Sequence, residues 1–227
     1  MIVFCGDSFC QPDSIKWNWM NQVSFDLKTS YESLGVNAVS NFDILTQVEY
    51  AVENIDYDIL IVLLTTIDRQ EYEPNPSDKL EPVKYKDMRN NIFSNTLTAL
   101  YREKIVTDDM LKFFMSAPLN LKKNEVYVEH MIKLCKKTDK PFLIFNNIFP
   151  VWNHENIDID YDHKFDYIQE GPIGLMEPAD FVEQYFPEIS ESVLDKPIPG
   201  TDRSCHLTLK QNTIWAMRVA DHIRKML

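Results

Sequence analysis

The chain has 227 residues, 44% hydrophobic and 26% charged, with 35 acidic against 23 basic residues and a formal net charge of −12. This length suits one α/β domain with a full core, spanning 1–227, and the acidic balance argues against a nucleic acid partner. No apolar run approaches the roughly 20 residues that cross a bilayer, and the N-terminus lacks signal-peptide features. We therefore expect a cytoplasmic protein with no membrane partner.

The first strand candidate is the apolar run Ile2–Cys5, which ends abruptly at Gly6-Asp7-Ser8. An unbroken run of β-favouring residues predicts a strand buried on both faces of a parallel sheet. The turn after it places the Ser8 hydroxyl at the carboxyl end of that strand, where α/β proteins bind their ligands. A serine in this position needs only a base to become a nucleophile.

Helices and strands alternate over the next part of the chain. Apolar residues recur at helical spacing in Asp13–Ser30 and in Asp43–Asn54, which predicts two amphipathic helices. The segment Gly35–Val39 is a short and ambiguous strand candidate between them. The continuous apolar run Asp58–Leu64 predicts a third strand, buried on both faces.

The middle of the chain begins with a segment rich in proline and charge, Glu71–Lys86, which we interpret as a surface excursion. A helical pair is expected at Asn91–Arg102 and Asp108–Met115, and a further helix at Glu125–Lys136. The apolar run Pro141–Phe145 predicts another buried strand, which ends at two asparagines.

The C-terminal part contains a long irregular segment, about 150–200, with helical periodicity only at Pro178–Tyr185. Segments of this kind in compact domains are usually binding loops or contact surfaces. A capping box at Thr208 starts the clearest helix of the chain. Its expected inward stripe consists of Ile214, Trp215, Val219, His222 and Ile223. This alternation of strands and helices predicts a three-layer α/β/α, doubly wound and mostly parallel sheet of flavodoxin-like type.

A possible base for Ser8 lies near the other end of the chain. His206 precedes the last helix, in a loop that a doubly wound fold can bring to the same sheet edge, and Asp202 in that loop can orient its imidazole. A serine, an imidazole and a carboxylate are the groups that a serine esterase requires, together with oxyanion donors. Ser8, His206 and Asp202 are therefore the candidate catalytic residues.

The order of these motifs resembles the SGNH, or GDSL-type, hydrolases, and is most similar to the short single-domain versions encoded by tailed phages. The resemblance rests on the N-terminal Gly6-Asp7-Ser8, on the Asp202 and His206 pair before a C-terminal helix, and on Trp17 and Trp19 after the serine. Two further blocks are similar, Asn37–Ile44 and Leu63–Arg69. The resemblance implies a cofactor-independent serine hydrolase, with a virion location if the chain is phage-encoded.

The chain departs from the family pattern at the oxyanion donors. Val39 or Ser40 stands where the second block has glycine, and Thr65-Thr66-Ile67-Asp68 replaces the Gly-x-Asn-Asp of the third block. Losing one such donor costs about 10²–10³ in rate. The candidate oxyanion or substrate residues in this chain are Ser40, Asn41, Thr65 and Arg69.

Three functions remain open on the sequence. The first is an esterase that hydrolyses a small acyl ester, an O-acetylated carbohydrate for example, through Ser8, His206 and Asp202, with a small-molecule or glycan ester as partner. The second is a catalytically weakened module of the same fold with a binding or structural role, in a virion for example. The third is a nucleotide- or sugar-binding α/β module without nucleophilic chemistry.

Other possible sites are interpreted as structural. Cys5, Cys10, Cys135 and Cys205 are scattered without CxxC spacing, so we expect free thiols and neither a disulfide framework nor a zinc site. The acidic run around Asp158, Asp160 and Asp162 lacks the EF-hand glycine and glutamate, which favours a solvated loop over a calcium site. We expect no metal and no cofactor. His130 and His222 lie within helices and are interpreted as structural.

Overall fold

A computed structural model describes residues 1–11, 18–36, 39–65, 69–72, 93–96, 107, 117–146, 168–170 and 209–227. The chain divides into two compact units. The first comprises Met1–Gln11 and Glu32–Gln169, and the second comprises Pro12–Tyr31 and Glu170–Leu227.

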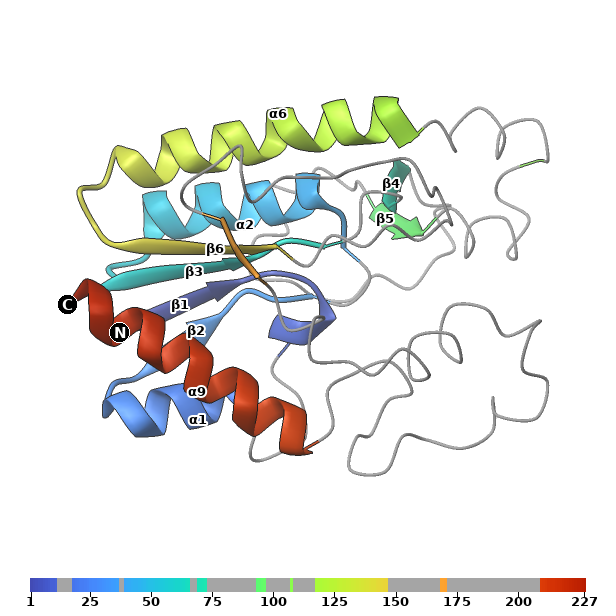
Figure 1. The fold of residues 1–227 in the computed structure, drawn as a ribbon. Coiled ribbons are helices and arrows are strands. Elements are labelled where there is room, and N and C mark those ends of the chain that lie inside the picture. The colour runs from blue at the N-terminus through green and yellow to red at the C-terminus, as the bar shows by residue number, and fades with distance from the viewer. Residues whose placement is uncertain are drawn as a thin grey trace, which may run out of the picture. The chain divides into compact units, whose positions relative to one another are not determined.

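The main sheet has five strands in the order β2-β1-β3-β6-β7 (Figure 1). They are β1 (Ile2–Cys5), β2 (Tyr31–Ser33), β3 (Ile59–Leu63), β6 (Phe142–Asn146) and β7 (Ile168–Glu170). β1 pairs in parallel with β3, Ile2 opposite Ile59, and β3 pairs in parallel with β6, Leu60 opposite Phe142. Numbered along the chain, the strands of this sheet lie in the order 2-1-3-4-5, which is the flavodoxin-like arrangement. The predicted α/β fold with a parallel sheet is confirmed.

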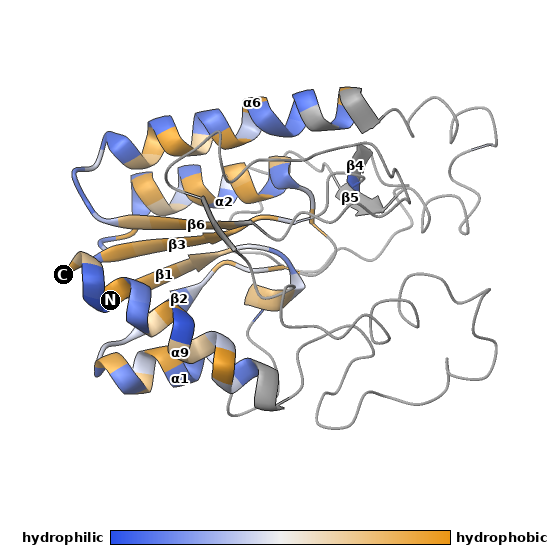
Figure 2. Ribbon diagram, in the orientation of Figure 1, coloured by the Kyte–Doolittle hydropathy of each residue, from blue (hydrophilic) through white to orange (hydrophobic). Residues whose placement is uncertain are grey.

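The three central strands form because their residues are apolar at every position, which suits burial on both faces of a sheet. Figure 2 shows β1, β3 and β6 as hydrophobic along most of their length. The four side chains of β1 and the five of β3 are all buried. The predicted strands at Ile2–Cys5, Asp58–Leu64 and Pro141–Phe145 are therefore confirmed, with boundaries shifted by one residue at some ends.

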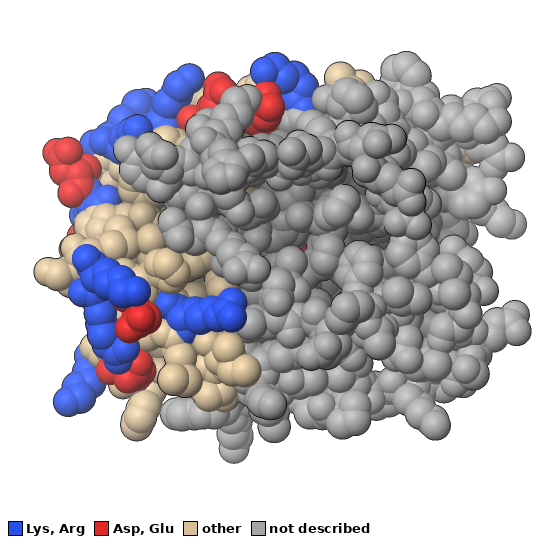
Figure 3. All heavy atoms as spheres, in the orientation of Figure 1, with Lys and Arg blue, Asp and Glu red and all other residues tan. Residues whose placement is uncertain are grey.

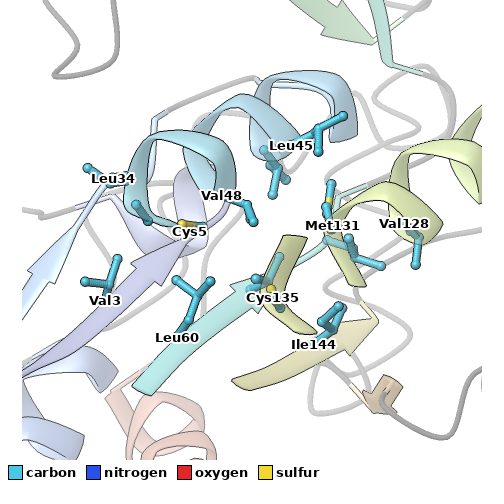
Figure 4. Packing of buried hydrophobic residues seen from close by; sticks show 14 of the residues in the cluster. Val3, Cys5, Leu34, Leu45, Val48, Leu60, Val128, Met131, Cys135 and Ile144 are labelled. Carbon is cyan, nitrogen blue, oxygen red and sulfur yellow. The ribbon is translucent and has the colours of Figure 1, made fainter. Parts of the chain in front are cut away.

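Two helices pack with this sheet in the first unit. α2 (Asn41–Asn54) begins at a capping box, in which Ser40 Oγ accepts from Asp43 N–H and the Asp43 carboxylate accepts from Ser40 N–H. α6 (Ala117–Lys136) packs against α2 and begins earlier than the expected Glu125. Their inner faces meet alternate residues of the strands in one core (Figure 4). Its members include Val3, Cys5, Leu45, Val48, Leu60, Val128, Met131, Cys135 and Ile144.

The expected strand at Gly35–Val39 is wrong over 35–36 and at Val39, and its other two residues lie outside the described residues. The strand is Tyr31–Ser33, and the following residues keep only part of its hydrogen bonding with β1. Leu34 N–H donates to Phe4 O at 2.8 Å, and Val36 N–H donates to Gly6 O at 3.3 Å. The segment therefore continues alongside β1 without forming a regular ladder.

A second correction concerns the segment after β3. The structure contains a separate antiparallel pair, β4 (Arg69–Tyr72) with β5 (Phe93–Thr96), in which Arg69 lies opposite Thr96. The expected helix at Asn91–Arg102 is therefore wrong over 93–96, and the expected excursion at Glu71–Lys86 begins within a strand. The Ser-Asn-Thr sequence of β5 has low helix propensity, which leaves strand pairing to decide its conformation.

The second unit contains α1 (Trp19–Leu27) and α9 (Leu209–Met226). Trp19 and Trp215 pack edge to face with ring centroids 6.0 Å apart, and Trp19 N–H donates to Asn212 Oδ1 at 3.2 Å. Of the expected inward stripe of α9, Trp215, Val219 and Ile223 are buried, whereas Ile214 is exposed and His222 is half-buried. Ala216 and Ala220 are buried in addition, which shifts the buried face of α9.

The expected helix Asp13–Ser30 is shorter in the structure, because Asn18 caps the start of α1 and Lys28 ends it in a left-handed conformation. Several expectations lie outside the described residues, namely residues 13–17 of that helix, the helix Asp108–Met115, the segment 150–200, the capping box at Thr208 and Cys205. None of the helices in the described ranges is long and apolar enough to cross a membrane. Basic and acidic side chains are interspersed on the described part of the surface that Figure 3 shows.

Candidate active site

The Gly6-Asp7-Ser8 turn connects β1 to a single 3-10 turn, η1 (Ser8–Cys10). Asp7 caps that turn, because its Oδ1 accepts from Phe9 N–H at 3.0 Å and its carbonyl accepts from Cys10 N–H at 2.9 Å. Ser8 is 6% exposed and Asp7 is 2% exposed. The turn is thus closed by its own hydrogen bonds and fixed at the end of a buried strand.

Gln47, in the middle of α2, holds the first residue of the turn. Its Oε1 accepts from Gly6 N–H at 2.7 Å, and its Nε2 donates to Gly6 O at 3.0 Å. A buried backbone donor or acceptor left without a partner costs about 1–3 kcal/mol. The side chain of Gln47 therefore satisfies the Gly6 backbone as a neighbouring strand would.

A second side-chain amide holds the backbone of Thr65, the second residue after β3. Thr65 N–H donates to Asn41 Oδ1 at 2.8 Å, and Asn41 Nδ2 donates back to Thr65 O at 3.0 Å. The same Nδ2 also donates to Asn124 Oδ1 at 2.6 Å, and Asn124 Nδ2 donates to Asn120 O at 2.7 Å. This chain of buried amides links α6 and α2 to the end of β3.

Asp7 joins the ends of β1 and β3. Its Oδ2 accepts from Thr65 Oγ1 at 2.7 Å and lies 3.4 Å from Arg69 Nη2. In an open sheet of this strand order, ligands bind beyond the carboxyl ends of the strands where the order reverses, which is between the first and third strands. Asp7, Ser8, Thr65 and Arg69 lie together at this position.

Ser8 is the nucleophile candidate at this edge. Neither its Oγ nor its N–H has a hydrogen-bond partner among the residues that the structure describes. The Ser8 hydroxyl is therefore not engaged in holding the described part of the turn. The other two candidates of the expected triad, His206 and Asp202, lie outside the described residues.

Three of the four candidate oxyanion residues use their donors within the protein. Ser40 N–H donates to Asp43 Oδ2 at 3.1 Å, and the two Asn41 amide hydrogens are directed to Thr65 O and Asn124 Oδ1. Thr65 donates through its N–H to Asn41 and through its Oγ1 to Asp7. Arg69 differs, because its Nε and Nη1 are buried and have no acceptor among the described residues.

Cys10 ends the turn that carries Ser8, and Cys5 and Cys135 belong to the hydrophobic core. Cys5, Cys10 and Cys135 are free and buried. Burial raises the pKa of Cys135 to about 12, and burial raises the pKa values of Cys5 and Cys10 as well. Asp7 adds to the increase in the pKa of Cys10.

We expect these three thiols to be unreactive toward Ellman's reagent in the folded protein at pH 8. At a pKa of about 12, roughly 10⁻⁴ of Cys135 is thiolate at that pH, and the thiolate is the nucleophile. A Cys205→Ser variant isolates the three buried thiols, which should react only after addition of denaturant. Rapid reaction of the folded variant would contradict their burial.

The raised pKa values of these thiols should also make the free energy of unfolding fall as the pH rises above about 9. The unfolded chain then releases thiol protons that the folded chain retains.

Sequence reasoning missed the roles of Asp7, Gln47 and Asn124. All three are polar and buried. Gln47 bonds the Gly6 backbone and Asp7 bonds Thr65 Oγ1, each at the end of a strand, whereas Asn124 accepts from the Asn41 side chain that holds Thr65. One signal was available for Gln47, which lies three residues after Ile44 and four before Ala51, on the apolar stripe of α2. A polar side chain on a buried stripe requires a hydrogen-bond partner.

Comparison with known proteins finds no matching family model and no matching curated protein. Among solved structures, the chain is similar to an acetyl xylan esterase from the rumen bacterium Butyrivibrio proteoclasticus, with 12% identity and a TM-score of 0.48. That match covers 99% of this chain and 63% of the esterase, so the chain spans less than two thirds of that protein. It is also similar to the acetyl xylan esterase AlAXEase, with 14% identity and a TM-score of 0.44 over 100% of this chain and 98% of that one.

Proposed function

We propose that this protein is a serine esterase that hydrolyses small acyl esters, with Ser8 as its nucleophile. The proposal is carried by one observation. Ser8 follows β1 at the point where the strand order reverses, in a turn held by Gln47 and Asp7, and its Oγ has no partner among the described residues. A preorganised hydroxyl at a ligand-binding edge is the arrangement that nucleophilic catalysis requires.

In the proposed reaction, Ser8 Oγ attacks the ester carbonyl carbon while His206 Nε2 accepts the hydroxyl proton. Asp202 accepts a hydrogen bond from His206 Nδ1–H and thereby fixes the imidazole tautomer. The tetrahedral intermediate expels the alcohol, which takes the proton from His206, and the acyl group remains on Ser8. Water then attacks the acyl-enzyme with His206 as base, releasing the acid and restoring Ser8.

The described residues around Ser8 have two separate roles in this proposal. Gln47, Asn41 and Thr65 hold the turn, because their polar groups are engaged with the backbone and with Asp7. Ser8 N–H has no acceptor within the described part of the chain and faces the developing oxyanion as its first donor. A rigid turn keeps this donor in place without reorganisation during the reaction.

The substrate class in this proposal is an O-acetylated carbohydrate or a similar small acyl ester. It follows from the resemblance of the sequence motifs to SGNH hydrolases. The partner is therefore a small-molecule or glycan ester, and the proposed reaction uses no cofactor.

Labelling with a fluorophosphonate probe tests the assignment of the nucleophile. The probe reacts with activated serines, so we expect one modified residue, Ser8, identified by peptide mass spectrometry. Labelling should proceed in step with loss of turnover of p-nitrophenyl acetate and of acetylated xylo-oligosaccharides. A protein that neither turns over these esters nor becomes labelled would instead favour a binding or structural module of the same fold.

A further inference from the structure

Arg69 has an unusual environment for a guanidinium group. Its side chain is 11% exposed, and Asp7 is its ion-pair partner, at 3.4 Å between Nη2 and Oδ2. Its Nε and Nη1 are buried and have no acceptor among the described residues. A buried donor without a partner costs about 1–3 kcal/mol, and more when the group is charged. An arrangement with this cost indicates that Arg69 is kept ready for an acceptor that arrives later.

The position of Arg69 identifies that acceptor. Asp7 Oδ2 binds Arg69, and Asp7 immediately precedes Ser8, whose Cα lies about 3.8 Å from that of Asp7. The guanidinium therefore lies at the turn that carries the nucleophile candidate. The group that gains negative charge next to Ser8 during ester hydrolysis is the carbonyl oxygen of the tetrahedral intermediate.

We propose that Arg69 is an oxyanion donor of this site, an inference that rests on the proposed function. Ser8 N–H supplies one hydrogen bond to the oxyanion, and the Arg69 guanidinium supplies another from Nε or Nη1. Arg69 thereby takes the place of the asparagine that this chain lacks at Ile67. It is a catalytic residue in this assignment, because it contacts the reacting oxygen.

The charges in the site support this role. The Asp7 carboxylate is next to Ser8, and a negative charge there would oppose the formation of an oxyanion. Arg69 pairs with Asp7 and so offsets that charge in the resting site. Thr65 Oγ1 donates to the same Asp7 oxygen at 2.7 Å, which fixes the carboxylate against which Arg69 is held. The guanidinium is thus oriented before the reaction, as electrostatic stabilisation requires.

The other three candidates are less suited to this role. Ser40 N–H is used in the capping box, the Asn41 amide has two acceptors, and both donors of Thr65 are engaged. To contact an oxyanion, each would have to give up a buried hydrogen bond. Arg69 gains a hydrogen bond without losing one.

Arg69→Lys and Arg69→Ala test this assignment with p-nitrophenyl acetate as substrate. Lysine keeps a positive charge beside Asp7 but lacks the Nε and Nη1 donors, so this variant should fold and still lose activity. We expect kcat to fall by about 10²–10³ in Arg69→Ala and by a smaller factor in Arg69→Lys, with KM little changed. Methylguanidinium added to Arg69→Ala should restore part of kcat, and methylammonium should restore less, because only the guanidinium has the forked donors.

The outcomes separate this inference from the proposed function. Turnover by the parent that depends on Ser8, together with an unchanged kcat in Arg69→Lys and Arg69→Ala, would overturn the role of Arg69 and leave the esterase proposal intact. A fall in kcat of Arg69→Ala that tracks a lower melting temperature, with parental kcat in Arg69→Lys, would also overturn it and indicate a structural ion pair. A parent without Ser8-dependent turnover would overturn both proposals.

Discussion

Replacing Ser8 by alanine is expected to lower kcat for p-nitrophenyl acetate by about 10⁴- to 10⁶-fold, the loss typical of removing the nucleophile of a serine hydrolase. The physical reason is specific to the nucleophilic oxygen. Alanine keeps the backbone of the turn, the Asp7 cap and the contacts of Gln47, but it has no atom that can form the acyl-enzyme. Steady-state hydrolysis and acyl-enzyme trapping by mass spectrometry measure this loss.

The stability of Ser8→Ala should be close to that of the parent, within about 1 kcal/mol, because the Ser8 hydroxyl has no hydrogen-bond partner in the described part of the structure. Loss of activity is then separable from loss of fold by thermal denaturation. Ser24→Ala is the matched control, since the hydroxyl of Ser24 in α1 donates to Thr29 O and has no role in the proposed chemistry. Parental kcat in Ser8→Ala would exclude Ser8 as the nucleophile.

The strands at the centre of the sheet could be predicted from the sequence because their signal is local. An unbroken apolar run of four or five residues predicts a strand that is buried on both faces, and Ile2–Cys5 and Ile59–Leu63 are such strands. The short strand Tyr31–Ser33 has no such run, and its residues are all only partly buried. The β4 and β5 pair depends on partners far apart in the chain, so helical periodicity in Asn91–Arg102 was misleading.

The candidate site shows the same difference between local and distant information. Gly6-Asp7-Ser8 could be recognised because the turn directly follows a strand. The long-range hydrogen bonds that hold the turn could not be predicted. Gly6 and Gln47 are separated by 41 positions in the sequence, and Asp7 and Thr65 are separated by 58. The donors of Ser40, Asn41 and Thr65 were candidates for the oxyanion on residue type alone. Ser40 is engaged locally, in the capping box with Asp43. Asn41 and Thr65 are engaged through contacts that join α2, α6 and the end of β3, which the sequence does not reveal.

Gly35→Ala is expected to destabilise the protein by about 3 kcal/mol or more, at the upper end of the range for overpacked cores. A Cβ atom at Gly35 would lie 2.3 Å from both the backbone C and the carbonyl O of Cys10. Cys10 ends the 3-10 turn that begins at Ser8, so relief of this clash requires movement of the turn itself. Urea denaturation should show the lower free energy of unfolding, and kcat of the folded fraction should fall as well.

Gly6→Ala is the matched comparison, because its closest contact is with a side chain. A Cβ atom there would lie 2.7 Å from Cys10 Sγ and 3.1 Å from Leu63 O. Removing the sulfur with Cys10→Ala should therefore reduce the cost of Gly6→Ala, with a coupling energy of about 0.5–3 kcal/mol. The same Cys10→Ala change should not reduce the cost of Gly35→Ala, whose contacts are with the C, O and Cβ atoms of Cys10, because alanine keeps all three. Equal coupling for the two glycines, or a parental free energy of unfolding in Gly35→Ala, would show that the turn is not packed against Cys10 as described.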